Sequence, residues 1–156
     1  MQAQTCPSSA IAISGYASLF DVQDYGQDIV RPGAFTTTLK SRGVQNIRML
    51  YQHDTSEPVG VWDRIAEDAN GLFVEGRVLC GGSRGAAVSR LISAGAVNGL
   101  SIGFRTVRSS PISHGGRNLL EIDLWEVSIV TFPMLPQARL RVLGVYETAS
   151  GSRVAA

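Results

Sequence analysis

The sequence has little of what marks several large classes of proteins. Its 156 residues include two cysteines, Cys6 and Cys80, which are too few for a disulfide framework. Neither cysteine lies at metal-ligand spacing from a histidine, and we expect no metal or other cofactor. No apolar run approaches the roughly 20 residues of a membrane span, and the N-terminus lacks the basic and apolar regions of a secretory signal. These absences predict a reduced, cytoplasmic protein that binds no membrane.

An excess of either charge is also missing. Lysine and arginine number 14, and aspartate and glutamate number 13, so nothing favours nucleic acid as a partner. The length suits one domain with a sizeable core, and the 17 glycines and mostly period-two apolar alternation predict a β-rich fold with few helices. We expect a folded domain at residues 10–146 between disordered tails at 1–9 and 147–156.

Strand patterns recur along the chain, with two helical segments between them. Asn70-Gly71 between apolar runs predicts a hairpin, and Gly43 is expected to end a short helix at 34–40. An amphipathic helix is expected at 84–94, with Ser83 as its N-cap. The expected strands are 11–20, 47–53, 59–68, 72–80, 99–108 and 119–132, with a last short element at 138–145.

The stretch from Gly99 to Arg105 is the most unusual part of the chain. Alternation places Leu100, Ile102 and Phe104 on one strand face, and Ser101 lies on the other face, flanked by glycines. Each strand glycine costs roughly 0.5–1 kcal/mol relative to alanine, and the close approach of a ligand or another backbone would explain that cost. Ser101 is either a nucleophile that receives a peptide or an edge-strand serine beside a bulge.

Gly-Leu-Ser-Ile-Gly also fits the nucleophile elbow of α/β-hydrolases, but the context does not. That elbow requires a helix directly after the serine, and the histidine follows the serine in the chain. Here the strand pattern continues through Arg108, and His53 precedes Ser101. We therefore set the α/β-hydrolase fold aside.

Two other residues are unusual for their positions. His53 closes the predicted strand 47–53 on the same face as three largely apolar residues, where it can be held as a general base or simply bond a backbone carbonyl. Glu126 interrupts an apolar strand, and an unpaired carboxylate there would cost several kcal/mol, so it requires a partner. Of the two histidines, His53 is better placed by pattern than His114, which lies in a glycine-rich loop.

Each of these residues has an ordinary structural explanation, but the combination suits one chemistry. In a serine hydrolase an acid orients a histidine, and the histidine deprotonates the serine. Glu126, His53 and Ser101 supply these three functions in that order. The alternative is a structural β domain in which the three side chains lie far apart.

Five short pieces of sequence, in a fixed order between residues 12 and 140, resemble a known family. They are residues 15–20 (GYASLF), 31–35 (RPGAF), 51–54 (YQHD) with 58–60 (PVG), 99–104 (GLSIGF), and 124–128 (LWEVS) with 131–133 (TFP). The set resembles the prohead proteases of tailed phages, which are capsid maturation proteases with a fold similar to that of herpesvirus assemblin.

The resemblance implies a fold and a site. The fold is α+β and β-rich: a closed or partly open β-barrel of mainly antiparallel strands flanked by a few helices. The implied site pairs His53 with Ser101 and adds an acidic third member, for which we choose Glu126. Asp123 lies on the opposite face of its strand, and His114 remains the rival because assemblins use a second histidine. Backbone N–H groups near residues 133–139 are implied as the oxyanion donors.

The resemblance also implies a function. The chain would be a serine endopeptidase that cleaves the scaffold segment of the major capsid protein, and itself, inside assembling proheads in the host cytoplasm. Its partners would be the capsid protein and its scaffold segment, and a homo-oligomer is left open. The alternative is a catalytically inactive β-barrel module that binds capsid or scaffold protein.

Overall fold

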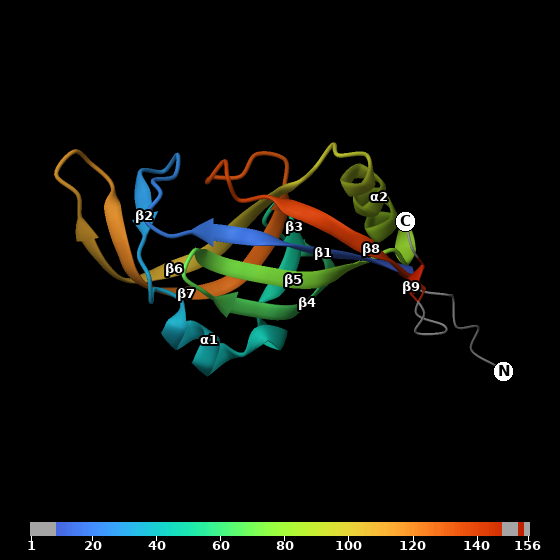
Figure 1. Cartoon of the computed structure of the whole chain (residues 1–156), viewed down its shortest axis with the longest axis horizontal. Coiled ribbons are helices and arrows are strands. Elements are labelled where there is room, and N and C mark those ends of the chain that lie inside the picture. Colours follow the sequence, from blue (N-terminus) through green and yellow to red (C-terminus); the bar gives the residue numbers. More distant parts are fainter. Residues whose placement is uncertain (1–8, 148–152, 155–156) are drawn as a thin grey trace.

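The computed structural model describes residues 9–147 and 153–154 (Figure 1). Its strands are β1 (Ser9–Leu19), β2 (Asp28–Val30), β3 (Arg48–Tyr51), β4 (Asp54–Glu67), β5 (Gly71–Leu79), β6 (Gly99–Pro111), β7 (Arg117–Val130), β8 (Leu140–Glu147) and β9 (Arg153–Val154). Its helices are α1 (Thr36–Arg42), the short 3-10 helix η1 (Val44–Asn46) and α2 (Gly82–Ser93). No helix in these ranges is long and apolar enough to span a membrane.

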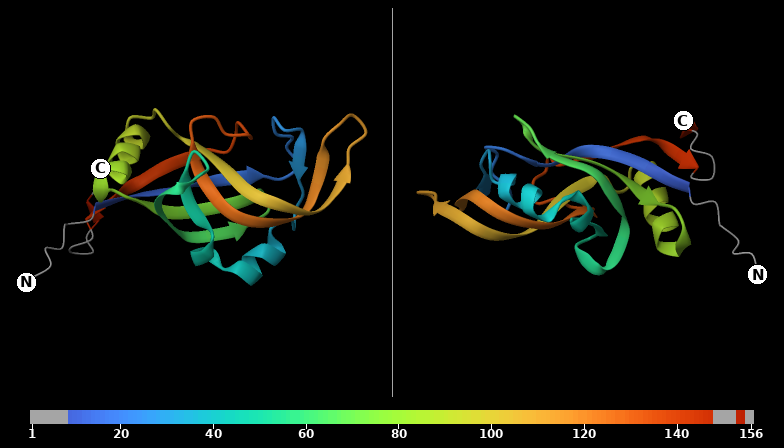
Figure 2. Two further views of the ribbon diagram at one scale, coloured as in Figure 1. Left: turned by 180° about the vertical axis from the view of Figure 1, so that it is seen from behind. Right: turned by 90° about the horizontal axis from the view of Figure 1, so that it is seen from below.

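One mixed sheet runs through the described residues. Its order is β2-β7-β3-β4-β5-β1-β8-β9, and β6 pairs with the remaining edge of β7. The pairings are antiparallel except that β2 and β3 run parallel to β7. Figures 1 and 2 show the β6–β7 hairpin and α2 at opposite ends of the molecule. The fold is therefore α+β and β-rich with few helices, as expected.

The expected barrel is confirmed only in part, because the sheet does not close. Between the start of β6 and the start of β8 there is one isolated bridge, Gly99–Arg139, where a closed barrel would have a full ladder. Two backbone hydrogen bonds, from Leu100 N to Ala138 O and from Leu140 N to Asn98 O, accompany the bridge. These bonds hold the segment before β8 against the beginning of β6.

Strand β7 is the organising element of the sheet. One edge pairs with β6 along nearly the whole strand, and the other pairs first with β2 and then with β3. At its end, Val127 and Ile129 face the hydrophobic core, and Ser128 on the other face lies under the turn between β3 and β4. Both faces of β7 are therefore buried at this end of the strand.

The predicted helices and hairpin are present, with different ends. Gly43 ends α1 with a φ of 76°, a left-handed value that glycine adopts without strain. The hairpin at Asn70-Gly71 joins β4 to β5, and the Asp68 carboxylate accepts both of its backbone N–H groups. Helix α2 begins at Gly82 with Gly81 as N-cap and no side-chain cap bond, so the assignment of Ser83 as N-cap was wrong.

Other observed boundaries of strands and of the folded part also differ from the predicted ones. Strand β3 ends at Tyr51, two residues before the predicted end, and β6 continues to Pro111, so the β6–β7 connection is shorter than expected. The folded part includes Ser9 and Glu147, one residue beyond the predicted domain at each end. Most of both predicted tails lies outside the described residues, but Arg153–Val154 forms a short strand paired with β8.

Candidate active site

His53 lies in the tight turn between β3 and β4, and not at the end of a strand as predicted. Both turn residues are left-handed, with φ of 55° at Gln52 and 61° at His53. Such conformations cost a non-glycine residue of order 1–3 kcal/mol and persist only where surrounding contacts enforce them. Here Gln52 N donates to Ile129 O at 3.0 Å, and the Gln52 amide bonds the Thr131 hydroxyl at 2.6 Å. These bonds fasten the turn to the end of β7.

Glu126 is the hydrogen-bond partner of the His53 side chain that this turn carries. Its Oε1 lies 2.5 Å from His53 Nδ1, and its Oε2 accepts the Ser128 hydroxyl at 2.6 Å. The carboxylate side chain is 12% exposed, whereas the imidazole is 43% exposed. The hydrogen bond to Glu126 raises the pKa of His53, burial opposes the shift, and the negative charge of Glu126 adds to it. An ionised Glu126 accepts a hydrogen bond from the N–H at Nδ1, which keeps the proton on Nδ1 and leaves Nε2 free to act as a base.

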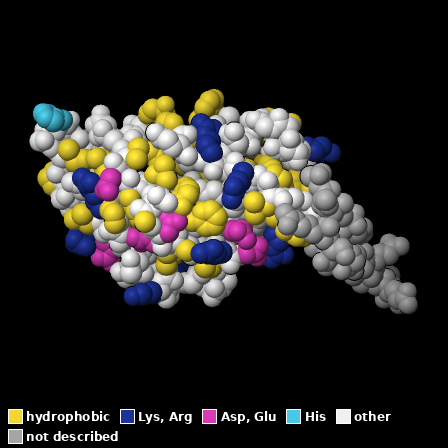
Figure 3. Space-filling model, viewed as in Figure 1, with side chains coloured by type: hydrophobic (Ala, Val, Ile, Leu, Met, Phe, Trp, Pro, Cys, Tyr) yellow, Lys and Arg dark blue, Asp and Glu magenta, His cyan; other side chains and the backbone are white. Residues whose placement is uncertain are grey.

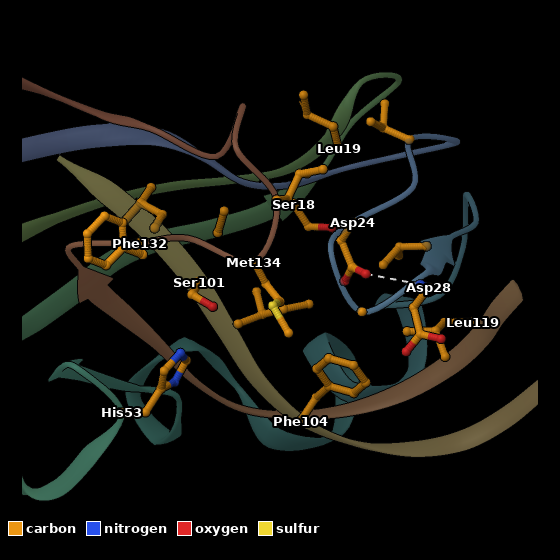
Figure 4. Close-up of a pocket in the computed structure, with 17 residues that line it drawn as sticks. Ser18, Leu19, Asp24, Asp28, His53, Ser101, Phe104, Leu119, Phe132 and Met134 are labelled. Carbon is orange, nitrogen blue, oxygen red and sulfur yellow. Dashed lines mark hydrogen bonds between the residues drawn. The ribbon is translucent and has the colours of Figure 1, made fainter. Parts of the chain in front are cut away.

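Ser101 lies on β6, directly opposite Ser128 in the β6–β7 ladder. It is 8% exposed, and Ser101 and His53 line the same cavity, whose volume is about 450 Å³. Figure 4 shows the two side chains beside each other at one side of this cavity. Within the described residues the Ser101 hydroxyl makes no hydrogen bond. The structure thus brings His53 and Glu126 into contact and places Ser101 at the same cavity.

The glycines beside Ser101 have a concrete explanation. A Cβ on Gly103 would lie 2.6 Å from Glu126 Cδ, and a Cβ on Gly99 would lie 2.6 Å from Val130 O and 2.8 Å from Pro133 Cδ. Side-chain carbons do not approach other atoms this closely. The Gly103 position therefore accommodates the Glu126 carboxylate, and the Gly99 position accommodates the backbone of β7 and the loop that follows it.

The two rivals of Glu126 lie elsewhere. His114 is exposed in the loop between β6 and β7 and does not line the cavity. Asp123 accepts hydrogen bonds from Arg42 at 2.6 Å and from the Trp125 indole at 2.8 Å. These two contacts lower the pKa of Asp123, which holds it as an anion in a surface ion pair.

Comparisons with known proteins identify the family of the chain. A family model described as the caudovirus prohead serine protease matches residues 1–150. The chain belongs to this family. It is also 38% identical over 132 residues to the prohead protease of Enterobacteria phage HK97, covering 83% of this chain and 58% of that protein. The chain therefore spans less than two thirds of the length of this relative.

Two solved structures of capsid-related and viral proteases share the fold. The bacteriophage T4 capsid assembly protease has a TM-score of 0.64 at 16% identity and covers 78% of this chain and 82% of its own. The KSHV protease in complex with a hexapeptide phosphonate inhibitor has a TM-score of 0.58 at 13% identity, covering 90% of this chain and 66% of its own. At these identities the likeness shows the fold alone, and the predicted similarity to herpesvirus proteases is confirmed at that level.

In this prohead protease family member, the cavity extends from Ser101 between two segments, the loop after β7 and residues 17–30, and the sequence analysis did not assign residues 17–30 to the site. Its walls are mostly apolar and come from β6, from residues 17–30, from Leu119 and from residues 132–135. Tyr25 N donates to Met134 O at 3.0 Å, which joins the two loops. Figure 3 shows apolar side chains protruding at the upper edge of the molecule, where these loops lie in Figure 1.

Two aspartates, Asp24 and Asp28, line the far end of the cavity, and both carboxylates already make hydrogen bonds to neighbouring residues. Asp28 pairs with Arg117 through two hydrogen bonds of 3.0 and 2.6 Å. Asp24 accepts the Asp28 backbone N–H at 3.0 Å, and burial raises the pKa of Asp24. The Asp24 carboxylate therefore stabilises the loop between β1 and β2, and the Asp28 carboxylate joins β2 to β7.

Sequence reasoning missed one residue of the site, Ser128. It lies two positions after Glu126 and is therefore on the same face of β7, so the pattern contained a signal: two polar residues on one face of an apolar strand. The cavity walls from residues 17–30 carried no such signal, because only the folded sheet brings that segment to Ser101.

Proposed function

We propose that this protein is a serine endopeptidase of phage capsid assembly, with Ser101, His53 and Glu126 as its triad. The observation that carries the proposal is the 2.5 Å bond between Glu126 and His53 at a cavity that Ser101 also lines. Membership in the prohead serine protease family supports the same reaction. The substrates would be the scaffold segment of the major capsid protein and the protease itself, cut inside assembling proheads in the host cytoplasm.

The mechanism is acyl transfer. Ser101 Oγ attacks the carbonyl carbon of the scissile peptide bond while His53 Nε2 takes the hydroxyl proton. His53 then gives that proton to the leaving amine as the C–N bond breaks, and an acyl-enzyme remains. Water deprotonated by His53 cleaves the ester and restores Ser101. Glu126 keeps the proton on Nδ1 throughout and stabilises the imidazolium that forms twice in each cycle.

The loop after β7 is our choice for the source of the oxyanion donors. Pro133 lies against Gly99, and the backbone of Ala138 bonds that of Leu100, the neighbour of Ser101. Backbone N–H groups from residues 133–139 would therefore be close to the carbonyl that Ser101 attacks. The same contacts lead us to interpret the sheet as a partly open barrel, whose gap lies between β6 and β8.

The apolar cavity would receive substrate side chains. Ile102, Phe104 and Met134 line it beside Ser101, and Phe132 is 90% exposed at its edge. Such a surface binds an extended, unfolded segment through apolar contacts that require no exact geometry. A scaffold segment with bulky apolar residues near the cleaved bond fits this surface.

The test combines labelling with cleavage. A fluorophosphonate should label the wild-type protein at Ser101, and Ser101→Ala should remain unlabelled. Incubation with a capsid protein that carries its scaffold segment should give a discrete product by mass spectrometry, absent with Ser101→Ala. A wild-type protein that neither reacts nor cuts, yet binds the capsid protein, would replace this proposal with the inactive binding module.

Self-cleavage is tested in the same samples. The C-terminal residues from Thr148 are small and polar and have little to bury, so a peptide groove can accept them as substrate. The wild type should shorten from this end over time while Ser101→Ala keeps its mass. Equal shortening in both would assign the trimming to a contaminating protease.

A further inference from the structure

Ser128 is a polar residue at the most buried point of the candidate site. It is fully buried on β7 (0% exposed), opposite Ser101 on β6 and Leu50 on β3. Its hydroxyl donates to Glu126 Oε2 at 2.6 Å and accepts the backbone N–H of His53 at 3.1 Å. Because Glu126 Oε1 meets His53 Nδ1, the three residues form a closed ring of hydrogen bonds.

The chemistry of the partners fixes the direction of each bond in this ring. A backbone N–H can only donate and an ionised carboxylate can only accept, so the proton of Ser128 must point to Glu126. The other carboxylate oxygen then accepts from His53 Nδ1. One hydroxyl therefore sets the orientation of the acid and, through it, the tautomer of the base.

We propose that Ser128 is a positioning residue that holds Glu126 and the His53 turn in the arrangement that the reaction requires. The inference rests on the proposed function. Without the hydroxyl, Glu126 loses one of its two anchors, and the His53 N–H loses its acceptor in a left-handed turn. Both losses displace the imidazole, although Ser128 itself would touch neither the substrate nor the reacting atoms.

The arrangement of charged groups near His53 allows its pKa to report on Glu126. Glu126 is the group that acts on the His53 pKa in the described part of the chain. The Asp54 carboxylate is turned to Ser56, bonding its N–H at 2.9 Å and its hydroxyl at 2.6 Å. Arg48 lies opposite Glu126 in the ladder, but its guanidinium donates to Gln45 O at 2.8 Å. Asp24 and Asp28, which line the same cavity, are engaged by the Asp28 backbone N–H and by Arg117, respectively.

The first experiment is kinetic. Ser128→Ala should lower kcat by about 10- to 100-fold, the usual cost of losing a residue that orients a site group, and leave KM within about two-fold. The ascending limb of kcat/KM against pH should move to lower pH, because a loosened Glu126 no longer raises the pKa of His53. Ser128→Thr keeps the hydroxyl and should restore most of kcat.

A matched control separates this effect from the loss of any buried hydroxyl. Ser89 is also buried, on α2, and its hydroxyl contacts the Cys80 thiol outside the cavity. Ser89→Ala should therefore leave kcat and the pH limb unchanged. If Ser128→Ala does not fold, Ser128→Cys, which keeps the size and donates weakly, should show an intermediate kcat loss. A pH limb that stays in place in every folded Ser128 variant would overturn the inference.

The second experiment requires no activity. The imidazole of His53 is titrated by NMR in Ser101→Ala and in Ser101→Ala/Ser128→Ala, with the signals of His114 as an internal reference. The His53 midpoint should be lower in the double variant. An equal midpoint overturns the positioning function whether or not the protein proves to be a protease. A lowered midpoint in a protein that never cleaves would support the ring and contradict the proposed function alone.

Discussion

Two parts of the cavity wall are built in opposite ways. In the hydrogen-bonded part, His53, Glu126 and Ser128 are joined by hydrogen bonds of 2.5 to 3.1 Å, and the turn that carries His53 is bonded to the end of β7. In the apolar part, the loop after β7 presents Phe132 and Met134 to solvent, and a backbone hydrogen bond from Tyr25 N to Met134 O joins it to the loop between β1 and β2.

The difference matches what each part has to do. Proton transfer depends on atoms placed to within a fraction of an ångström, which requires directional bonds and a buried support. Apolar contact with a peptide depends on area and tolerates movement. Changes in the hydrogen-bonded part should therefore reduce kcat, and changes in the apolar part should alter KM.

The largest effect is expected at the reacting pair. Ser101→Ala and His53→Ala should each lower turnover by roughly 10⁶-fold, since members of a triad act as a unit. Neither should unfold the protein, because both side chains face the cavity. Single-turnover cleavage of the capsid substrate measures the loss, and more than a few per cent of residual activity in Ser101→Ala would end its assignment as nucleophile.

The second largest loss of turnover is expected at Glu126. Removing the charge of an orienting acid while retaining its shape lowers kcat roughly 10⁴-fold. The activity of Glu126→Gln should therefore be reduced but measurable. His114→Ala should be close to wild type in the same assay. The reverse pair of results would make His114 the third member of the triad.

The apolar part of the cavity wall should give a smaller effect of a different kind. Phe132→Ala should raise KM by about 10-fold for a substrate with bulky apolar residues, in line with the loss of a few buried methylenes, and leave kcat within about two-fold. Tyr25→Ala is the matched control, because Tyr25 is 76% exposed and its side chain does not line the cavity. A fall in kcat without a change in KM would remove the contrast between the two parts of the wall.

The smallest effect is on stability. The folded-state pKa of His53 is raised above 6.5, so its bond to Glu126 adds stability that is fully present below about pH 6.5 and is lost as the pH rises through the raised value. The imidazole is 43% exposed, so the contribution should stay below about 1 kcal/mol. The comparison is with His53→Asn, because asparagine tolerates the left-handed turn.

Denaturant unfolding at several pH values measures this difference. The wild type should exceed His53→Asn in unfolding free energy by more at pH 6 than at pH 9. A difference that does not change over this range would show that His53 and Glu126 are not coupled in solution.

The sequence was informative about the site where physics leaves few choices. A carboxylate in an apolar strand has to be paired, and with two histidines in the chain the partner of Glu126 could be predicted. The position of His53 was wrong, because Gln52-His53 has no glycine or proline to signal a turn. Two consecutive left-handed residues are enforced here by bonds to Ile129 and Thr131, about 77 residues away along the chain.

The cavity and Ser128 were missed for a related reason. Alternation along β7 predicts two faces, but it does not say what covers each face, and the turn that covers Ser128 is placed by parallel pairing of β3 with β7. The walls from residues 17–30 reach Ser101 only through the order of strands in the sheet. Long-range pairing, and not local pattern, decides these features.

Substitutions at positions 103 and 126 should be coupled, because the Glu126 carboxylate occupies the space that a side chain at position 103 would fill. Gly103→Ala alone should force the carboxylate away from His53 and reduce activity. A shorter acid would leave room for the added methyl group, so Glu126→Asp in the Gly103→Ala background should recover part of what either change alone removes. A double-mutant cycle would measure this compensation, and selection of active variants should then return alanine at 103 only together with a smaller residue at 126.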